Sequence, residues 1–323
     1  MYVVTGAAGF IGSCLVQFLN EQGIVDLLLV DDFQRHEEKI PNYEGKQYLR
    51  CIERSDFLSV WDTEQFSPKG VFHLGARTDT TERDWSIFQR LNLDYSQGIW
   101  QRCTEQNIPL VYASSAATYG NGELGYQDRH DILEQLAPLN AYGKSKNDFD
   151  RWAISGNEAP PAWYGLKFFN VYGPNEYHKG RMASVIYHTF RKLKATGQMQ
   201  LFRSHRPDFA DGHQSRDFVY VKDLCRVMHW LMTNLPSQNG LYNMGTGQAR
   251  TFLDLATNTF RSADVDPHIT FVDTPADIRN NYQYFTEADM SKLRSAGYAE
   301  PFATLEEGIE DYVKNYLIPG KYW

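Results

Sequence analysis

A tyrosine and a lysine stand four residues apart in the segment Tyr142-Gly-Lys-Ser-Lys146. In a helix this spacing puts both side chains on one face, so a phenol and an ammonium can share a site. A free phenol with a pKa near ~10 is a poor base, but a neighbouring cation stabilises the phenolate and allows proton exchange with a carbinol. Upstream, Ser115 follows an apolar run, where its hydroxyl can reach the same oxygen. On its own, a Tyr-x-x-x-Lys pair is more often part of a solvated helix face. Whether it is catalytic therefore depends on the motifs around it.

The context is a glycine motif near the amino terminus. Gly6, Gly9 and Gly12 form G-x-x-G-x-x-G between an apolar run and a stretch with helical spacing. Glycines at these positions permit a tight turn and the approach of a pyrophosphate to the N-terminus of a helix, with Phe10 and Ile11 beside the phosphates. The motif therefore predicts a dinucleotide site, and the competing interpretation is a glycine-rich turn without ligand.

The acidic residue that such a site needs lies nineteen residues after Gly12, at Asp31. A carboxylate here meets the adenosine ribose hydroxyls, which favours NAD. Arg35, His36 and Lys39 follow within one loop and can hold a 2′-phosphate, which favours NADP. The sequence leaves both cofactors open.

Short apolar runs that end at Gly, Asp or Ser alternate with stretches of helical spacing, which predicts an α/β fold with a Rossmann-type doubly wound parallel sheet. The predicted strands are Tyr2 to Thr5, Leu27 to Asp31, Gly70 to Leu74, Leu110 to Ala113, Tyr164 to Phe169 and Leu241 to Met244. We expect residues 1–170 plus about 218–247 to form this domain, and about 171–217 plus 248–323 to form a smaller C-terminal substrate-binding lobe over the carboxyl ends of the strands. The polar stretch Phe202 to Ser215 predicts a surface loop.

Composition narrows the class of protein. A net charge of −8, from 32 Lys and Arg against 40 Asp and Glu, disfavours a nucleic acid or an anionic membrane as partner. Cys14, Cys51, Cys103 and Cys225 show no C-x-x-C spacing, so neither a metal site nor a disulfide framework is expected. No apolar run reaches membrane-spanning length, and the first strand begins at Tyr2, so no signal peptide is expected. We expect a cytoplasmic protein.

The glycine motif, the serines at 114–115 and Tyr142-x-x-x-Lys146 together resemble the extended short-chain dehydrogenase/reductase family, over essentially the whole chain. A narrower resemblance is to members of that family that epimerise an ADP-linked heptose at C6. It rests on YASSAATYG at 112–120, FFNVYGPNEYHKGRMASVIYH at 168–188, RDFVYV at 216–221, NMGTG at 243–247 and YFTEADMSKLRSAGY at 284–298, the HKG-x-MAS block being the most specific.

The resemblance implies a reaction without net redox change. Bound NADP, with NAD as the alternative, takes hydride from C6, and the hydride returns to the other face of the ketone. Two proton-transfer groups are then needed, and the resemblance assigns them to Tyr142 and Lys179. The plainer interpretation of Lys179 is a surface lysine or a phosphate contact.

The resemblance also assigns binding residues. For the cofactor they are Gly6, Gly9, Phe10, Ile11, Gly12, Asp31, Asp32, Lys39, Leu74, Gly75, Ala76, Arg77, Thr78, Asn92, Tyr142, Lys146, Val171 and Lys179. For the nucleotide sugar they are Ser115, Asn170, Arg181, His188, Phe202, Arg203, Ser204, His205, Arg216 and Tyr282. Arg216 offers a planar fork to a diphosphate, unless it pairs with Asp217 or Asp223. A homo-oligomer, a pentamer, is also implied.

Three other functions are weighed. A 4,6-dehydratase needs an acid pair after the strand-end serine, where this chain has Ala116 and Ala117, which cannot transfer protons. A UDP-hexose 4-epimerase uses the same serine, tyrosine and lysine but has no use for Lys179. A dinucleotide-sensing binding module has no need of Tyr142. Two departures from the family pattern, a longer loop between Phe202 and Arg216 and Arg181 in place of a serine, touch the sugar-nucleotide site.

Overall fold

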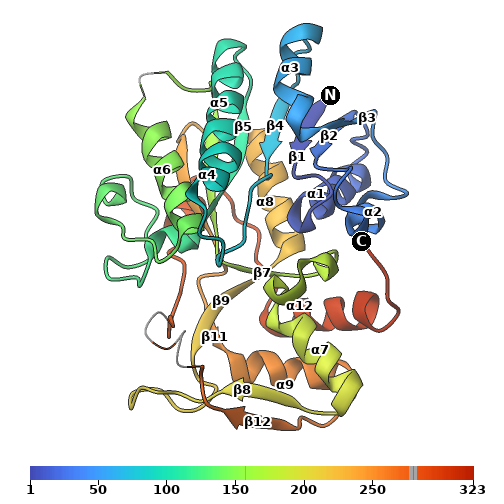
Figure 1. The fold of residues 1–323 in the computed structure, drawn as a ribbon, viewed down its shortest axis with the longest axis vertical. Coiled ribbons are helices and arrows are strands. Elements are labelled where there is room, and N and C mark those ends of the chain that lie inside the picture. Colours follow the sequence, from blue (N-terminus) through green and yellow to red (C-terminus); the bar gives the residue numbers. More distant parts are fainter. Residues whose placement is uncertain (157, 276–278, 280–281) are drawn as a thin grey trace.

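The large sheet is the frame of the molecule (Figure 1). The computed structural model describes residues 1–156, 158–275, 279 and 282–323. Seven strands, all in parallel pairs, follow the order β10-β6-β5-β4-β1-β2-β3. Their bounds are β1 Tyr2–Thr5, β2 Leu27–Asp31, β3 Arg50–Glu53, β4 Gly70–His73, β5 Leu110–Ser115, β6 Trp163–Phe168 and β10 Gly240–Met244. β1, β2, β4, β6 and β10 are almost wholly buried, which explains their continuous apolar sequences.

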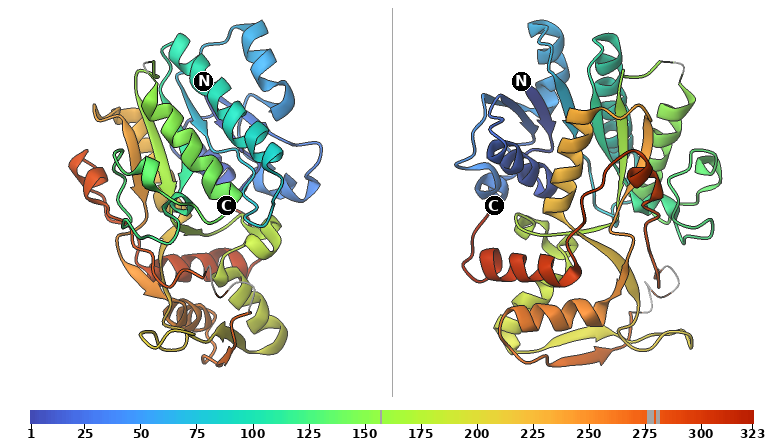
Figure 2. Two further views of the ribbon diagram at one scale, coloured as in Figure 1. Left: turned by 60° about the vertical axis from the view of Figure 1, so that its left-hand side comes forward. Right: turned by 180° about the vertical axis from the view of Figure 1, so that it is seen from behind.

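Helices cover both faces of this sheet (Figure 2). On one face α1, Phe10–Glu21, packs against α8, Val221–Asn234. On the other face lie α3, Arg54–Glu64, α5, Tyr95–Glu105, and α6, Ala141–Ser155. Shorter helices are α2 Ile40–Tyr43, α4 Trp85–Phe88 and α11 Ser291–Ser295, and single helical turns include Ala116–Tyr119 and Tyr177–Met182. The predicted Rossmann-type doubly wound fold is confirmed.

A smaller lobe lies below the carboxyl ends of the strands in Figure 1. It contains a two-stranded sheet of β8, Met199–Phe202, and β12, Ile269–Val272, with α7, Val185–Thr196, α9, Phe252–Ser262, and α12, Leu305–Tyr312. A second sheet, in the order β11-β9-β7, comprises β7 Asn170–Tyr172, β9 Ser215–Tyr220 and β11 Ala249–Thr251. The predicted lobe boundaries at about 170 and 218 fall on β7 and β9, which pair with each other, and the division itself stays a prediction.

Candidate active site

A cavity of about 1150 Å³ opens at the carboxyl ends of β1, β2, β4 and β5. The strand order reverses between β1 and β4, and at such a switch point open α/β sheets bind ligands. The cavity wall continues into the smaller lobe, where Arg216 and Phe252 contribute. The cavity is therefore lined both by residues of the segment 6–12, here called the glycine turn, and by residues of the smaller lobe.

The glycine turn forms one end of the cavity. Gly6, Gly9, Phe10, Ile11 and Gly12 all line it, and Gly9 caps α1 without any side chain that could occupy the first N–H groups. A Cβ on Gly12 would lie 2.0 Å from the carbonyl oxygen of Gly6, so only glycine allows α1 to start this close to β1. The turn presents the start of a twelve-residue helix to the cavity, which suits a pyrophosphate.

The carboxylate at the end of β2 is already engaged by the protein. Asp31 accepts hydrogen bonds from the backbone N–H groups of Ala8 at 3.0 Å and Asp32 at 2.8 Å, and from the Lys39 ammonium at 3.3 Å. Asp32 in turn accepts from Arg54 at 3.0 Å. Both acids line the cavity together with Arg35, His36, Lys39 and Arg54. The positive side chains of Arg35, Lys39 and Arg54 therefore line the cavity beside the end of β2, where an adenosine ribose would lie.

Tyr142 and Ser115 meet where α6 approaches the end of β5. Asn140 caps α6 by accepting a hydrogen bond from the backbone of Gly143 at 2.8 Å. A Cβ on Gly143 would lie 2.7 Å from the Ala117 carbonyl oxygen, so glycine permits this close packing. Tyr142 and Ser115 both line the cavity. Burial raises the pKa of the Tyr142 phenol, and a hydrogen bond with the Ser115 hydroxyl opposes that rise.

Lys146 lies behind Tyr142 instead of in the cavity wall. It is 4% exposed, and its ammonium donates to the Ala113 carbonyl at 2.7 Å. Burial lowers its pKa to about 8, and the charge of Asp150 opposes this shift. Tyr142, Lys146 and Asp150 recur every four residues, so one face of α6 touches β5 at three consecutive turns.

Asp150 belongs to a buried polar cluster that the sequence analysis missed. It accepts from the Tyr112 hydroxyl at 3.0 Å, the Ser114 hydroxyl at 2.6 Å and the Lys167 ammonium at 2.8 Å. Asp150 and Lys167 are both fully buried. Lys167 also donates to Thr118 at 2.8 Å, which joins β6 to the turn after Ser115. A lysine in the middle of an apolar strand was the available signal, because a buried charge needs a partner.

Lys179 lines the cavity from the turn Tyr177–Met182. Its ammonium lies 5.1 Å from the centre of the Phe10 ring, beside the glycine turn. Burial lowers its pKa, and the carboxylate of the fully buried Glu176 opposes this. Lys179 is therefore a half-buried cation in the cavity wall, and its role as a proton-transfer group or as a phosphate contact stays a prediction.

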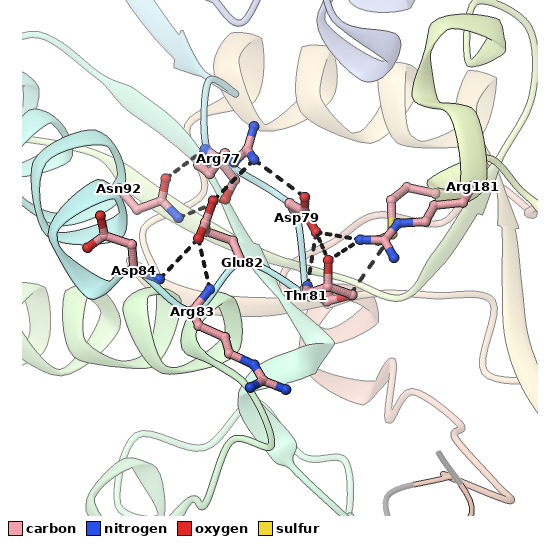
Figure 3. Close-up of polar contacts among 10 residues, drawn as sticks. Arg77, Asp79, Thr81, Glu82, Arg83, Asp84, Asn92 and Arg181 are labelled. Atoms are coloured by element: carbon pink, nitrogen blue, oxygen red, sulfur yellow. Dashed lines mark hydrogen bonds and ion pairs between the residues drawn. The ribbon is translucent and has the colours of Figure 1, made fainter. Parts of the chain in front are cut away.

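Most predicted cofactor residues line the cavity, including Leu74, Gly75, Ala76, Arg77, Thr78 and Val171. Asn92 lies outside the described lining. Its side chain accepts from the Arg77 N–H at 2.7 Å and donates to the Arg77 carbonyl at 3.0 Å, so it fixes the loop that lines the cavity (Figure 3).

The predicted substrate residues divide into two groups. Ser115, Asn170, Arg181, Arg216 and Tyr282 line the cavity, whereas His188, Phe202, Arg203, Ser204 and His205 are absent from its described lining. Arg203 instead lies near the carboxylates of Asp211, at 3.6 Å, and Asp273, at 3.7 Å. The structure does not bring this second group to the wall, and its role in binding stays a prediction.

Ala116 and Ala117 also line the cavity, next to Ser115. Neither can transfer a proton, so the wall lacks at these two positions the acid pair that elimination of water would need.

Comparison with known proteins places this geometry in a family. The model of the NAD dependent epimerase/dehydratase family matches residues 2–245. The chain belongs to this family. Two curated relatives are named ADP-L-glycero-D-manno-heptose-6-epimerase: one from Fusobacterium nucleatum is 46% identical, and one from Nitratidesulfovibrio vulgaris strain Hildenborough is 47% identical, each over 98% of both chains.

Solved structures of the NAD dependent epimerase/dehydratase type agree with the fold. An ADP-L-glycero-D-manno-heptose-6-epimerase from Helicobacter pylori superposes with a TM-score of 0.81 at 25% identity, over 97% of this chain and 95% of that one. A Thermus thermophilus UDP-glucose 4-epimerase in complex with NAD gives a TM-score of 0.73 at 25% identity, over 97% of each chain. The chain is an epimerase that uses NAD or NADP. In the described part of the chain, no helix combines the length and the apolar character needed to cross a bilayer.

Proposed function

We propose that this epimerase inverts C6 of the heptose in ADP-D-glycero-D-manno-heptose and yields ADP-L-glycero-D-manno-heptose, a precursor of the lipopolysaccharide core. Two curated relatives named ADP-L-glycero-D-manno-heptose-6-epimerase match the chain over nearly its whole length. The structural observation that carries the proposal is that Arg216 is a buried cation in the cavity wall.

Arg216 is a buried cation that lines the cavity and is only 7% exposed. Its guanidinium donates to the carbonyls of Ser215, at 2.9 Å, and Gln283, and its central carbon lies 5.7 Å and 5.6 Å from the ring centres of Phe252 and Tyr282. No carboxylate among the described residues forms an ion pair with it.

The two acids that could have paired with Arg216 are occupied elsewhere. Asp217 accepts from the backbones of Thr246, Gly247 and Ala288, and Asp223 pairs with Arg226. A buried guanidinium without a counter-charge is costly, and a planar fork of donors suits a diphosphate. These contacts support the proposal that Arg216 binds the diphosphate of the substrate.

The proposed cofactor is NADP. The glycine turn fits a pyrophosphate. In an NAD site the carboxylate at the end of β2 is free to bind the ribose, but here Asp31 accepts hydrogen bonds from Ala8 of the glycine turn and from Lys39. Arg35, Lys39 and Arg54 line the adjacent wall, where they would hold a 2′-phosphate. Mass spectrometry of the nucleotide released on denaturation tests this choice, and recovery of NAD alone would contradict it.

The side chains around the cavity supply the proton chemistry. When bound, the dinucleotide supplies reversible hydride acceptance. Ser115 would hold the oxygen on C6, and Tyr142 beside it would exchange that oxygen's proton on one face of the carbon. Lys179 would serve as the second proton-transfer group, for the opposite face. Lys146, fixed to the Ala113 carbonyl behind Tyr142, would supply the positive charge that favours phenolate.

The direct test is to incubate the protein with ADP-D-glycero-D-manno-heptose and, separately, with UDP-galactose, and to follow epimerisation by NMR. Inversion at C6 of the ADP-heptose alone is expected. Turnover of the UDP sugar alone would replace the proposal with a UDP-hexose 4-epimerase.

We also propose that the protein works in the cytoplasm as a homo-oligomer, a pentamer. Light scattering after size-exclusion chromatography measures the mass, and a monomer of 37.3 kDa would contradict the assembly.

A further inference from the structure

The helical turn Tyr177–Met182, here called the crossing segment, contacts both walls of the dinucleotide groove. Lys179 lies in its middle, and His178, Arg181 and Met182 also line the cavity. One wall is the glycine turn with α2, and the other is the loop after β4, residues 75–84. The residues on either side of Lys179 are attached to different walls.

The first attachment runs through Asn42 of α2, whose side chain is fully buried. Its amide donates to the Ala8 carbonyl in the glycine turn at 2.8 Å and to Nδ1 of His178 at 3.2 Å. Burial and the charges of Lys39 and Lys179 lower the pKa of His178 to about 4, so the ring is neutral at pH 7 and can accept this bond. One amide group thus holds the glycine turn and the crossing segment together.

The second attachment is at the other wall (Figure 3). The Arg181 guanidinium donates to the Asp79 carboxylate at 3.3 Å and to the Thr81 hydroxyl, and the Thr80 hydroxyl lies 4.0 Å from the sulfur of Met182. The loop that receives Arg181 is itself held in place. Asp79 accepts from the Thr81 N–H at 2.9 Å and from its hydroxyl at 2.7 Å.

An epimerase of the proposed kind returns the same hydride that it removed, so its dinucleotide must stay bound between the two half-reactions. A segment fastened to both walls would oppose release, and it would also hold Lys179 at a fixed place. Neither effect requires Asn42 or Asp79 to touch the substrate.

We propose that Asn42 and Asp79 are positioning residues which, through His178 and Arg181, fasten the crossing segment over the groove, hold Lys179 there and retain the dinucleotide. This inference rests on the proposed function for the role of Lys179. Arg181, predicted from sequence to bind the sugar nucleotide, is assigned here to closing the groove.

The test measures how fast bound NADPH leaves the protein when chased with excess NADP, followed by the fluorescence of NADPH. The Arg181 side chain is 65% exposed, and an exposed ion pair contributes at most about 1 kcal/mol, which corresponds to roughly fivefold in rate. We expect Arg181→Gln and Asp79→Asn each to speed release by up to about fivefold. The double variant should release NADPH about as fast as the faster single variant, because both substitutions remove the Arg181–Asp79 ion pair. Asp79 also pairs with Arg77 at 3.4 Å, so Arg181→Gln is the variant that leaves that second contact in place.

Two further variants sharpen the result. Arg181→Lys keeps the cation and should restore slow release, which a role in packing alone would not predict. Arg83→Gln is the matched control, because this guanidinium belongs to the same loop but points away from Asp79 in Figure 3, and its release rate should be that of the wild type.

Asn42→Ala removes the other attachment, to His178, and should also speed release. Release at the wild-type rate in both Arg181→Gln and Asp79→Asn would overturn the proposal for Asp79, as would effects that multiply in the double variant, and release at the wild-type rate in a folded Asn42→Ala would overturn it for Asn42. This assay contains no sugar. The rate of NADPH release can therefore be measured even if the protein does not epimerise ADP-heptose. Failure of the proposed function is therefore separated from failure of this inference.

Discussion

Arg216 is a buried cation in the cavity wall, and its charge predicts an anionic ligand. Replacing it with methionine keeps the apolar contacts with Phe252 and Tyr282 and removes the charge. Because hydrogen bonds to charged groups contribute about 1.5–3 kcal/mol, we expect ADP to bind roughly 10- to 100-fold more weakly to Arg216→Met in titration calorimetry. The thermal midpoint of the free protein should change little, because removal of a buried charge without a counter-charge offsets the loss of the hydrogen bonds to the Ser215 and Gln283 carbonyls.

Arg226→Met is the matched control for that prediction. Arg226 pairs with Asp223, which is 1% exposed, so its loss leaves a buried carboxylate without its cation and with the Ala303 N–H as a donor. This variant should bind ADP normally but unfold at a lower temperature. Unchanged ADP affinity in Arg216→Met would remove Arg216 from the binding site.

Tyr142 is the residue on which turnover should depend most. Tyr142→Phe keeps the ring and removes the hydroxyl, so the rate of epimerisation should fall by about 10²- to 10⁴-fold, the usual contribution of general acid–base catalysis. Dinucleotide content, measured by absorbance of the released cofactor, should stay close to that of the wild type. A variant with normal turnover would contradict the assigned role and reopen the interpretation as a binding module.

At the scale of elements, α6 depends on its contacts with β5. The proposed role of Lys146 requires the ammonium form, and its pKa is lowered to about 8, so activity should fall as the pH rises through about 8. Asp150 raises the pKa of Lys146, and Asp150→Asn should therefore move this loss of activity to lower pH. The measurement is kcat/KM as a function of pH.

Two variants test whether that shift is electrostatic. Asp148→Asn, on the same helix but paired at the surface with Lys144, should leave the pH profile unchanged. Asp150→Asn/Lys167→Met removes both buried charges, so it should be more stable than Asp150→Asn but keep the shifted profile. A profile equal to that of the wild type would show that Asp150 is only structural.

The close approach of α6 to the turn after Ser115 gives a second prediction. A methyl group at Gly143 would collide with the Ala117 carbonyl and push Tyr142 away from Ser115. Since a displacement of ~1 Å can cost about 10²-fold, Gly143→Ala should lower kcat by up to about that factor. In Gly156→Ala, at the end of the same helix, the nearest atom would be 3.6 Å away, and kcat should be unchanged. Equal kcat values would argue against this packing constraint.

Elements with a strong local pattern could be predicted from the sequence, and contacts between distant segments could not. The bounds of β1 and β2 match the prediction, because both are continuous buried apolar runs. β3 was not predicted, since it is a half-exposed edge strand that begins and ends with charged residues. Asp150 and Lys167 lie on different elements, and only the fold brings them together.

At the scale of the whole molecule, the dinucleotide should stabilise the folded chain. A ligand at a hundred times its Kd adds about 2.7 kcal/mol, so NADP should raise the thermal midpoint by a few degrees. Lys39→Ala should reduce this rise for NADP more than for NAD, because the ammonium lies beside Asp31 in the cavity wall, where we propose that the 2′-phosphate is held. Scanning fluorimetry with both cofactors measures the difference, and equal losses would favour NAD as the natural ligand.

The arrangement of the large sheet has one practical consequence. Cys14, Cys103 and Cys225 are buried, whereas Cys51 is exposed on the edge strand β3, opposite Leu29 of β2 and two residues before the partner of Asp31. A maleimide dye added to the native protein should react at this thiol alone. The unmodified sequence therefore carries a single attachment point for a fluorescent reporter, two strands from the glycine turn.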